Sequence, residues 1–248
     1  MTTEYSDRRR WTSFDSVFNF RDLGGHRTRD SRQVRWRRLF RSAALGLMTD
    51  TDLERFAELG IRTVIDLRFP EEISQYGRLA GHDAVRYRNI CLRHTPWDLV
   101  PFQPGEDAER WVAGRYLQMS EEGRADIAAA LALIADADAV PAVVHCLVGK
   151  DRTGIISALT LSLLGVPDDD VADEYALSTE GFLRLTAWER QEYGDQAPVH
   201  KPSTRETMLH YLAELRARHG SIPGYVRDAG LTDAQIASLA ANLLEPTD

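Results

Sequence analysis

The chain has 248 residues and a formal net charge of −8, because 38 acidic residues outnumber 30 basic ones. This length is sufficient for one large domain with a buried core, and the acidic balance argues against nucleic acid as a partner. No segment approaches the roughly 18 apolar residues of a membrane span, and residues 1–5 lack the pattern of a secretory signal peptide. The two cysteines, Cys91 and Cys146, exclude a disulfide framework, so we expect a reducing, cytoplasmic compartment.

Predicted strands and helices alternate over the first two thirds of the chain. Alternating apolar and basic residues over 34–40 predict a half-buried strand with a solvated arginine face. Thr51 and Glu54 have the spacing of a capping box, and Gly60 suits the end of the helix that follows. Further strands are expected at 61–66, 85–91 and 139–144, and further helices from 70, at 108–120, at 123–135 and at 153–164. This alternation predicts an α/β fold with a central, mainly parallel sheet flanked by helices.

The last third of the chain is predicted to be helical. Helices at 168–190, at 204–219 and from 232 are separated by a break over 193–202 that contains glycine and proline. We interpret residues 1–248 as a single domain, with an α/β core over about 14–181 and a helical addition over about 182–248.

The segment with the most chemical information is 145–154, which reads His-Cys-Leu-Val-Gly-Lys-Asp-Arg-Thr-Gly between a predicted buried strand and a predicted buried helix. A loop before a helix N-terminus directs backbone N–H groups and a positive dipole at an anion. In the C-x5-R spacing, the guanidinium of Arg152 is placed to grip two phosphate oxygens, and these groups favour the thiolate of Cys146. We therefore expect a thiolate nucleophile that attacks phosphorus, rather than the inert buried thiol that an isolated cysteine would suggest.

The same segment resembles the signature of bacterial cysteine-dependent protein tyrosine and lipid phosphatases, the family of the mycobacterial secreted tyrosine phosphatase. The resemblance runs in order over about residues 14–245. Weaker similarities to the motifs of this family lie at 18–25, at 38–42, at 66–68 with Glu71 or Glu72, at 173–178 and at 211–244.

The resemblance implies a tyrosine-phosphatase-like fold and hydrolysis of phosphate monoesters through a phosphocysteine, without a metal ion or cofactor. It assigns Cys146 as the nucleophile and Arg152, with the loop amides, as the phosphate-binding group. Thr153 donates to the departing thiolate, and His145 orients the loop. The other loop residues are assigned to substrate binding: Leu147, Val148, Gly149 and Lys150.

Three aspartates are candidates for the general acid. No Trp-Pro-Asp tripeptide occurs in the chain, and the resemblance implies that the loop aspartate, Asp151, protonates the leaving group. Asp98, within the long loop at 94–107, and Asp66, at the end of a predicted strand, stay open as alternatives. An ion pair with a neighbouring arginine is the structural alternative for Asp151.

The substrate is expected to be a phosphorylated protein or peptide, with phosphotyrosine favoured and phosphoinositides or phosphoserine and phosphothreonine as alternatives. Lys150, one of only two lysines, raises the positive potential at the loop, and Arg68 and Asp66 are assigned to the substrate mouth. A non-catalytic phosphate-binding module and a rhodanese-type sulfur transferase are the other classes considered. The helices at 181–220 lie where relatives carry a lid, and they either cover the site or complete the core. Oligomeric state stays open, as does export by a signal-independent route.

Overall fold

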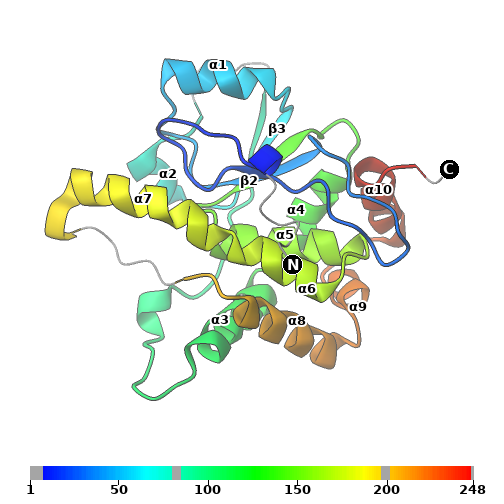
Figure 1. Cartoon of the computed structure of the whole chain (residues 1–248). Helices are drawn as coiled ribbons and strands as arrows, with labels where there is room; N and C mark the ends of the chain where they lie inside the picture. Colours follow the sequence, from blue (N-terminus) through cyan, green and yellow to red (C-terminus); the bar gives the residue numbers. More distant parts are fainter. Residues whose placement is uncertain (1–7, 80–84, 197–201, 247–248) are drawn as a thin grey trace.

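A five-stranded sheet lies at the centre of the computed structural model, which describes residues 8–79, 85–196 and 202–246 (Figure 1). The strand order is β1-β2-β5-β3-β4, and every neighbouring pair is parallel except β1 with β2. The strands are β1 (Arg21–Asp22), β2 (Leu39–Ser42), β3 (Thr63–Asp66), β4 (Arg86–Asn89) and β5 (Ala142–His145). The predicted mainly parallel sheet is thus confirmed.

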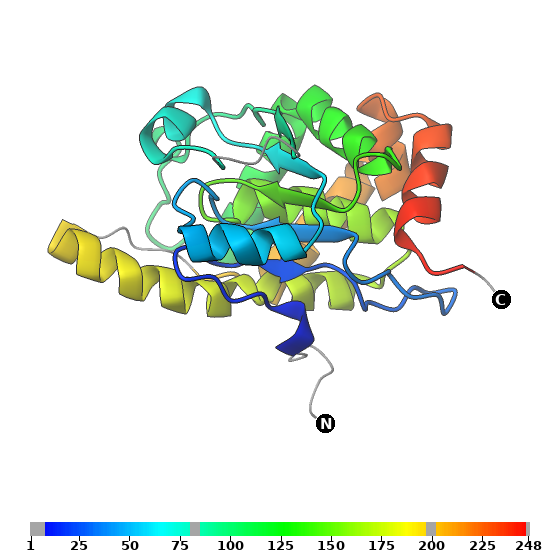
Figure 2. The same cartoon turned by 90° about the horizontal axis from the view of Figure 1, so that it is seen from above.

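Helices cover both faces of this sheet (Figures 1 and 2). The α-helices are α1 (Asp50–Glu58), α2 (Pro70–Tyr76), α3 (Ala108–Glu122), α4 (Arg124–Ala135), α5 (Asp151–Leu163), α6 (Asp168–Ala176), α7 (Ser178–Tyr193), α8 (Arg205–His219), α9 (Ile222–Asp228) and α10 (Asp233–Leu243). Short 3₁₀ turns lie at η2 (Arg8–Arg10), η3 (Trp97–Leu99) and η4 (Gly194–Gln196). The helices expected from 51, from 70, from 108, from 123 and from 153 are therefore present, with ends that differ by a few residues.

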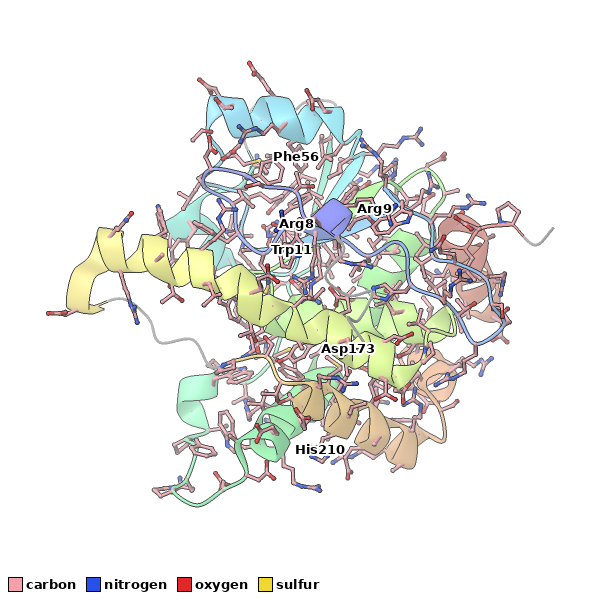
Figure 3. All side chains as sticks on the ribbon, viewed as in Figure 1. Arg8, Arg9, Trp11, Phe56, Asp173 and His210 are labelled. Atoms are coloured by element: carbon pink, nitrogen blue, oxygen red, sulfur yellow. The ribbon has the colours of Figure 1, made fainter. Side chains whose placement is uncertain are left out.

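The alternation of side chains along the strands builds two hydrophobic cores. On β5, Val143 points into a cluster with Phe56 of α1 and with aromatic residues of 14–20, and Figure 3 shows Phe56 between α1 and the sheet. Its neighbour Val144 points the other way, into a larger cluster built from α3 to α6 and α8 to α10. Both faces of the central strand are fully buried, as its wholly apolar sequence predicts.

The three central strands end side by side. Because β5 pairs in register with both neighbours, His145 lies between Ser42 of β2 and Asp66 of β3. The segments that follow these residues must therefore begin at one edge of the sheet, where ligands bind in open α/β folds. This edge places the loop that begins at Cys146 beside the segments that begin at Ala43 and Leu67.

The helices of the C-terminal part differ in their packing. Helix α8 places fully buried side chains in the larger core, among them Tyr211 and Leu215, so it completes the core rather than covering the site. Helix α7 crosses the molecule and its far end extends beyond the other helices (Figures 1 and 2). Leu183 of α7 is 70% exposed.

Two predictions of local structure were wrong. The predicted strand over 34–40 is interrupted by a turn at 36–38, where Arg37 takes a left-handed backbone conformation with φ of 59°, and β2 begins only at Leu39. The capping box of α1 uses Thr49 and Asp52, two residues before the predicted pair, although Gly60 follows the helix with φ of 66° as expected. None of the helices described here has the length and apolar character that crossing a membrane requires.

Candidate active site

The loop at 146–150 joins the central strand to α5 and holds the candidate nucleophile. Cys146 is 2% exposed, and its Sγ accepts a hydrogen bond from the backbone N–H of Gly149 at 3.3 Å. Helix α5 begins immediately afterwards at Asp151, so its unpaired N-terminal amides and its dipole face the same region. Both features direct partial positive charge at the sulfur of Cys146.

Gly149 has a conformation that the loop requires. Its φ is 73°, and a Cβ atom there would lie 2.4 Å from the carbonyl oxygen of Ser42. Its own carbonyl oxygen accepts hydrogen bonds from Asn19 Nδ2 at 3.0 Å and from an Arg41 amino group at 2.7 Å. In addition, the N–H of Ala44 donates to the carbonyl of Leu147 at 2.9 Å. Residues from the first fifth of the chain thus fix the loop from outside.

A buried ion cluster supports this anchoring. Glu174 of α6 accepts from Arg21 Nε at 2.7 Å and from an Arg41 amino group at 2.6 Å, and all three side chains are at most 2% exposed. Burial opposes ionisation of Glu174, but the two guanidinium groups lower its pKa to about 2. Burial and the neighbouring charge of Arg41 lower the pKa of Arg21 to about 9, so Arg21 still carries its charge at neutral pH.

This cluster changes the interpretation of the arginine-rich N-terminal region. The arginines over 34–40 were predicted to be solvated, yet Arg41, the next residue along the chain, and Arg21 of β1 are both fully buried. The ring of Trp11, labelled in Figure 3, lies under the guanidinium of Arg21 at 5.3 Å. Ser178, the first residue of α7, also accepts from Arg21, at 2.9 Å. Arg41 contacts both Ser178 and the carbonyl of Gly149, so it joins the base of α7 directly to the phosphate loop. Arg21 reaches the loop through Asn19, whose amide donates to the same carbonyl.

Arg152 is held by a carboxylate on a neighbouring helix. Its two amino groups donate to the two oxygens of Glu72 on α2, at 2.5 and 2.7 Å, and one also donates to the carbonyl of Leu67 at 3.4 Å. Burial opposes ionisation of Glu72, and the Arg152 charge and hydrogen bonds reverse this and lower its pKa. Three of the five guanidinium N–H groups are used in this way. The edge formed by Nε and one amino group remains to grip two oxygens of a phosphate.

Asp66 and Arg68 are both fully buried and face each other. Arg68 donates to Asp66 Oδ2 at 2.7 Å, and Tyr87 donates to the same oxygen at 2.7 Å. Burial raises the pKa of Asp66, but the neighbouring His145 and Arg68 and the hydrogen bond from Tyr87 outweigh it and lower this pKa to about 2. A carboxyl group held as an anion in this way is unsuited to donate a proton at neutral pH.

His145 links this pair to the loop. Its Nε2 lies 3.6 Å from Asp66 Oδ2, and its Nδ1 lies 3.1 Å from the carbonyl oxygen of Cys146. Burial lowers the pKa of His145, which keeps the ring neutral near pH 7. His145 thus connects Asp66 with the backbone of the loop.

Asp151 is partly exposed and lies at the N-terminus of α5. The hydroxyl of Tyr116 donates to its Oδ1 at 2.6 Å, and Lys150 Nζ lies 3.8 Å from the same oxygen. Asp151 is thus held mainly by a tyrosine and not by an arginine. The hydroxyl of Thr153 is buried and has no hydrogen-bond partner among the described residues. Of the alternative acids, the side chain of Asp98 lies outside the part of the chain that the structure describes.

An apolar groove lies beside the loop. It has a volume of about 170 Å³ and is lined by loop residues, by α7, by α2 and by the segments near 16 and 43. The lining residues are Ser16, Phe18, Ala43, Ala44, Leu47, Tyr76, Leu147, Val148, Leu185, Trp188 and Glu189. The side chains of Leu147 and Val148 therefore form one wall of this groove.

Two contacts in the site were not predicted from the sequence. Tyr116 has no local signal, because it reaches Asp151 from α3 across the core. His94 follows β4 and stacks on Phe69 with ring centroids 5.1 Å apart, close enough to Arg152 and Asp151 for their charges to act on it. Among these partners, only Glu72 was indicated by the sequence, where Glu71 or Glu72 belonged to a weak family motif.

Comparisons with known proteins give a consistent family. The model of the tyrosine phosphatase family matches residues 12–245. A putative tyrosine-protein phosphatase of Cupriavidus necator is 31% identical over 94% of this chain and 88% of its own length. The triple specificity protein phosphatase PtpB of Mycobacterium tuberculosis is 27% identical over 92% of this chain and 97% of its own. Among solved structures, Pseudomonas aeruginosa TpbA is 15% identical over 78% of this chain and 86% of that one, with a TM-score of 0.32, which is too low to support an argument.

Proposed function

The chain belongs to the tyrosine phosphatase family, and on this premise we propose that Cys146 is the nucleophile of a cysteine-dependent phosphatase. Membership agrees with the resemblance found at 145–154. The observation that carries the assignment is the buried Sγ of Cys146, which receives the N–H of Gly149 in front of the α5 N-terminus. Arg152, which Glu72 holds in place, supplies a positive charge that binds the phosphate.

The reaction proceeds in two steps that use the loop at 146–150 and the first two residues of α5. The thiolate sulfur of Cys146 forms a bond to phosphorus while the bond from phosphorus to the leaving oxygen breaks, and Asp151 gives that oxygen its proton. In the second step water attacks the phosphocysteine, gives its proton to the Asp151 carboxylate and displaces the thiolate, which releases inorganic phosphate. Arg152 and the loop amides hold the phosphoryl oxygens in both steps, where they stabilise charge in the transition state.

We propose supporting roles for the other predicted residues. Asp66 and Arg68 form an ion pair with each other in the interior, so they act on the site only through His145, which lies beside Asp66. Thr153, whose buried hydroxyl lacks a partner among the described residues, donates to the thiolate as it leaves. Lys150 adds a positive charge beside Asp151.

Phosphotyrosine in a protein or peptide is the substrate that the groove supports best. Its wall of Leu147, Val148 and Trp188 suits an aromatic ring or the apolar residue next to it. One relative is named a triple specificity phosphatase, so phosphoinositides and phosphoserine or phosphothreonine are the second candidates. We further propose that α7, with the segments around it, covers this groove. The protein is a single domain, and it works in a reducing compartment where Cys146 is not oxidised.

The test compares four classes of substrate in the presence of a chelator. Phosphotyrosine and phosphoserine peptides, p-nitrophenyl phosphate and phosphoinositide vesicles are offered to wild type, to Cys146→Ser and to Cys91→Ser. Cys146→Ser is expected to lose hydrolysis of every substrate and to retain substrate binding. Cys91→Ser, which changes the second free cysteine, is expected to retain hydrolysis. Activity of Cys146→Ser would refute the mechanism. An inactive wild type that binds phosphate would favour the non-catalytic module.

A further inference from the structure

Two buried tyrosines continue from Asp151 into the core. The hydroxyl of Tyr116 on α3 lies 2.6 Å from Asp151 Oδ1, and the hydroxyl of Tyr175 on α6 lies 2.6 Å from that of Tyr116. Both tyrosines are at most 1% exposed. Three elements, α3, α5 and α6, thus meet at one chain of oxygen atoms that ends at the proposed general acid.

The direction of these hydrogen bonds follows from counting hydrogens. Burial raises the pKa of both Tyr116 and Tyr175, so each hydroxyl keeps its single proton. An ionised carboxylate only accepts, so the proton of Tyr116 must point to Asp151 Oδ1. Tyr116 can then only accept from Tyr175. The chain therefore runs from Tyr175 to Tyr116 to Asp151.

This chain treats the two oxygens of Asp151 differently. Oδ1 receives the Tyr116 proton and lies nearest to Lys150 Nζ, at 3.8 Å, while none of the described residues donates to Oδ2. A carboxyl proton on Oδ1 would compete with the proton of Tyr116 for the same space, whereas a proton on Oδ2 leaves the hydrogen bond intact. We infer that Tyr116, itself held by Tyr175, is a positioning residue that directs the transferable proton of Asp151 to Oδ2. This inference rests on the proposed role of Asp151 as the acid.

The electrostatic surroundings of Asp151 fix the sign of the effect. The groups that face it are Lys150 and Arg152 from its own loop, His94 from the segment after β4, Tyr116 from α3 and Tyr175 from α6. A hydrogen bond from Tyr116 stabilises the carboxylate more than the carboxylic acid. Removing it therefore keeps Asp151 protonated to higher pH.

The test measures kcat against pH with phenyl phosphate, whose poor leaving group depends on a proton, and with p-nitrophenyl phosphate. The basic limb of such a profile reports the acid in the enzyme–substrate complex. In Tyr116→Phe we expect this limb to move up by about one pH unit, from the strength of a hydrogen bond to a charged group. The plateau with phenyl phosphate should fall several-fold, and the plateau with p-nitrophenyl phosphate should stay close to wild type.

Tyr211→Phe is the matched control, because it removes another fully buried hydroxyl from the same cluster. Tyr211 packs on Tyr116 with ring centroids 5.9 Å apart, but its hydroxyl bonds to Ser120 at 2.8 Å. The basic limb of the pH profile of Tyr211→Phe should therefore lie at the same pH as in wild type. An equal shift in both variants, or no shift in Tyr116→Phe, overturns the inference.

Asp151→Asn separates this inference from the proposed function. If the basic limb disappears in Asp151→Asn but does not move in Tyr116→Phe, the acid is correct and the positioning role is wrong. If Asp151→Asn retains the limb, the acid lies elsewhere, and both statements fail. Should Tyr116→Phe not fold, Tyr175→Phe replaces it: a smaller upward shift supports the chain of hydrogen bonds, and an unmoved limb overturns it.

Discussion

Replacing Glu174 by glutamine tests the buried ion cluster behind the phosphate loop. The side chain keeps its shape, but the negative charge between Arg21 and Arg41 disappears, at distances of 2.7 and 2.6 Å and at exposures of at most 2%. Two guanidinium groups are then left in the interior without a counter-charge. Removing one partner of a buried ion pair costs about 3–5 kcal/mol in the free energy of unfolding. In a chain of this size each kcal/mol lowers Tm by about 2–4 °C, so we expect a fall of about 6–20 °C.

The assay is chemical and thermal denaturation of wild type, Glu174→Gln and Asp173→Asn. Asp173 is the preceding residue of α6, labelled in Figure 3, and its Oδ1 lies 2.5 Å from Arg205 Nε. Because those side chains are 21% and 41% exposed, the same change of carboxylate to amide should cost only about 0–1 kcal/mol there. A loss below 1 kcal/mol in Glu174→Gln, or a loss equal in the two variants, would refute the reasoning.

Three further results are expected. Gly149→Ala should lower kcat at least tenfold because its Cβ meets backbone, whereas Gly60→Ala, with a similar φ of 66° but open space, should leave kcat unchanged; equal rates would contradict this. Glu72→Gln should release the loop arginine and weaken inhibition by inorganic phosphate about tenfold, measured as the inhibition constant, and an unchanged constant would count against the clamp. The pKa values of Asp66 and Glu174, both lowered to about 2, contribute stability that is complete above their unfolded values and is lost as pH falls toward 2. The denaturant midpoint should therefore decrease between about pH 5 and pH 2, and a constant midpoint over that range would contradict the assignment.

The sequence was sufficient where the signal is local. The apolar run ahead of Cys146 and the glycine at 149 each act over a few residues, so the strand, the loop and the start of α5 could be predicted together. The alternation that predicts a strand failed at 36–38, where the backbone turns at Arg37 in a left-handed conformation. Alternation of apolar and polar residues indicates which side chains are buried, but it does not predict where the backbone turns.

The partners of the site residues lay beyond sequence reasoning for a different reason. Tyr116 and Asp151 are 35 residues apart, and Arg152 and Glu72 are 80 apart, so no spacing rule connects them. An arginine in an acidic, arginine-rich chain is also most often a surface residue. Only the fold shows that Arg21 and Arg41 enclose a single carboxylate.

The anchoring of Gly149 has a consequence for the order in which the protein folds. Its carbonyl is bound by side chains that are 130 and 108 residues away along the chain. Contacts between such distant segments carry a large loop-closure cost and form late during folding. The strand before the loop also pairs with β2 and β3 from the first third of the chain, and the cup that binds phosphate is complete only when the N-terminal segment has docked. The signature segment alone therefore does not make the anchored loop, which also needs the side chains of Asn19 and Arg41 in place.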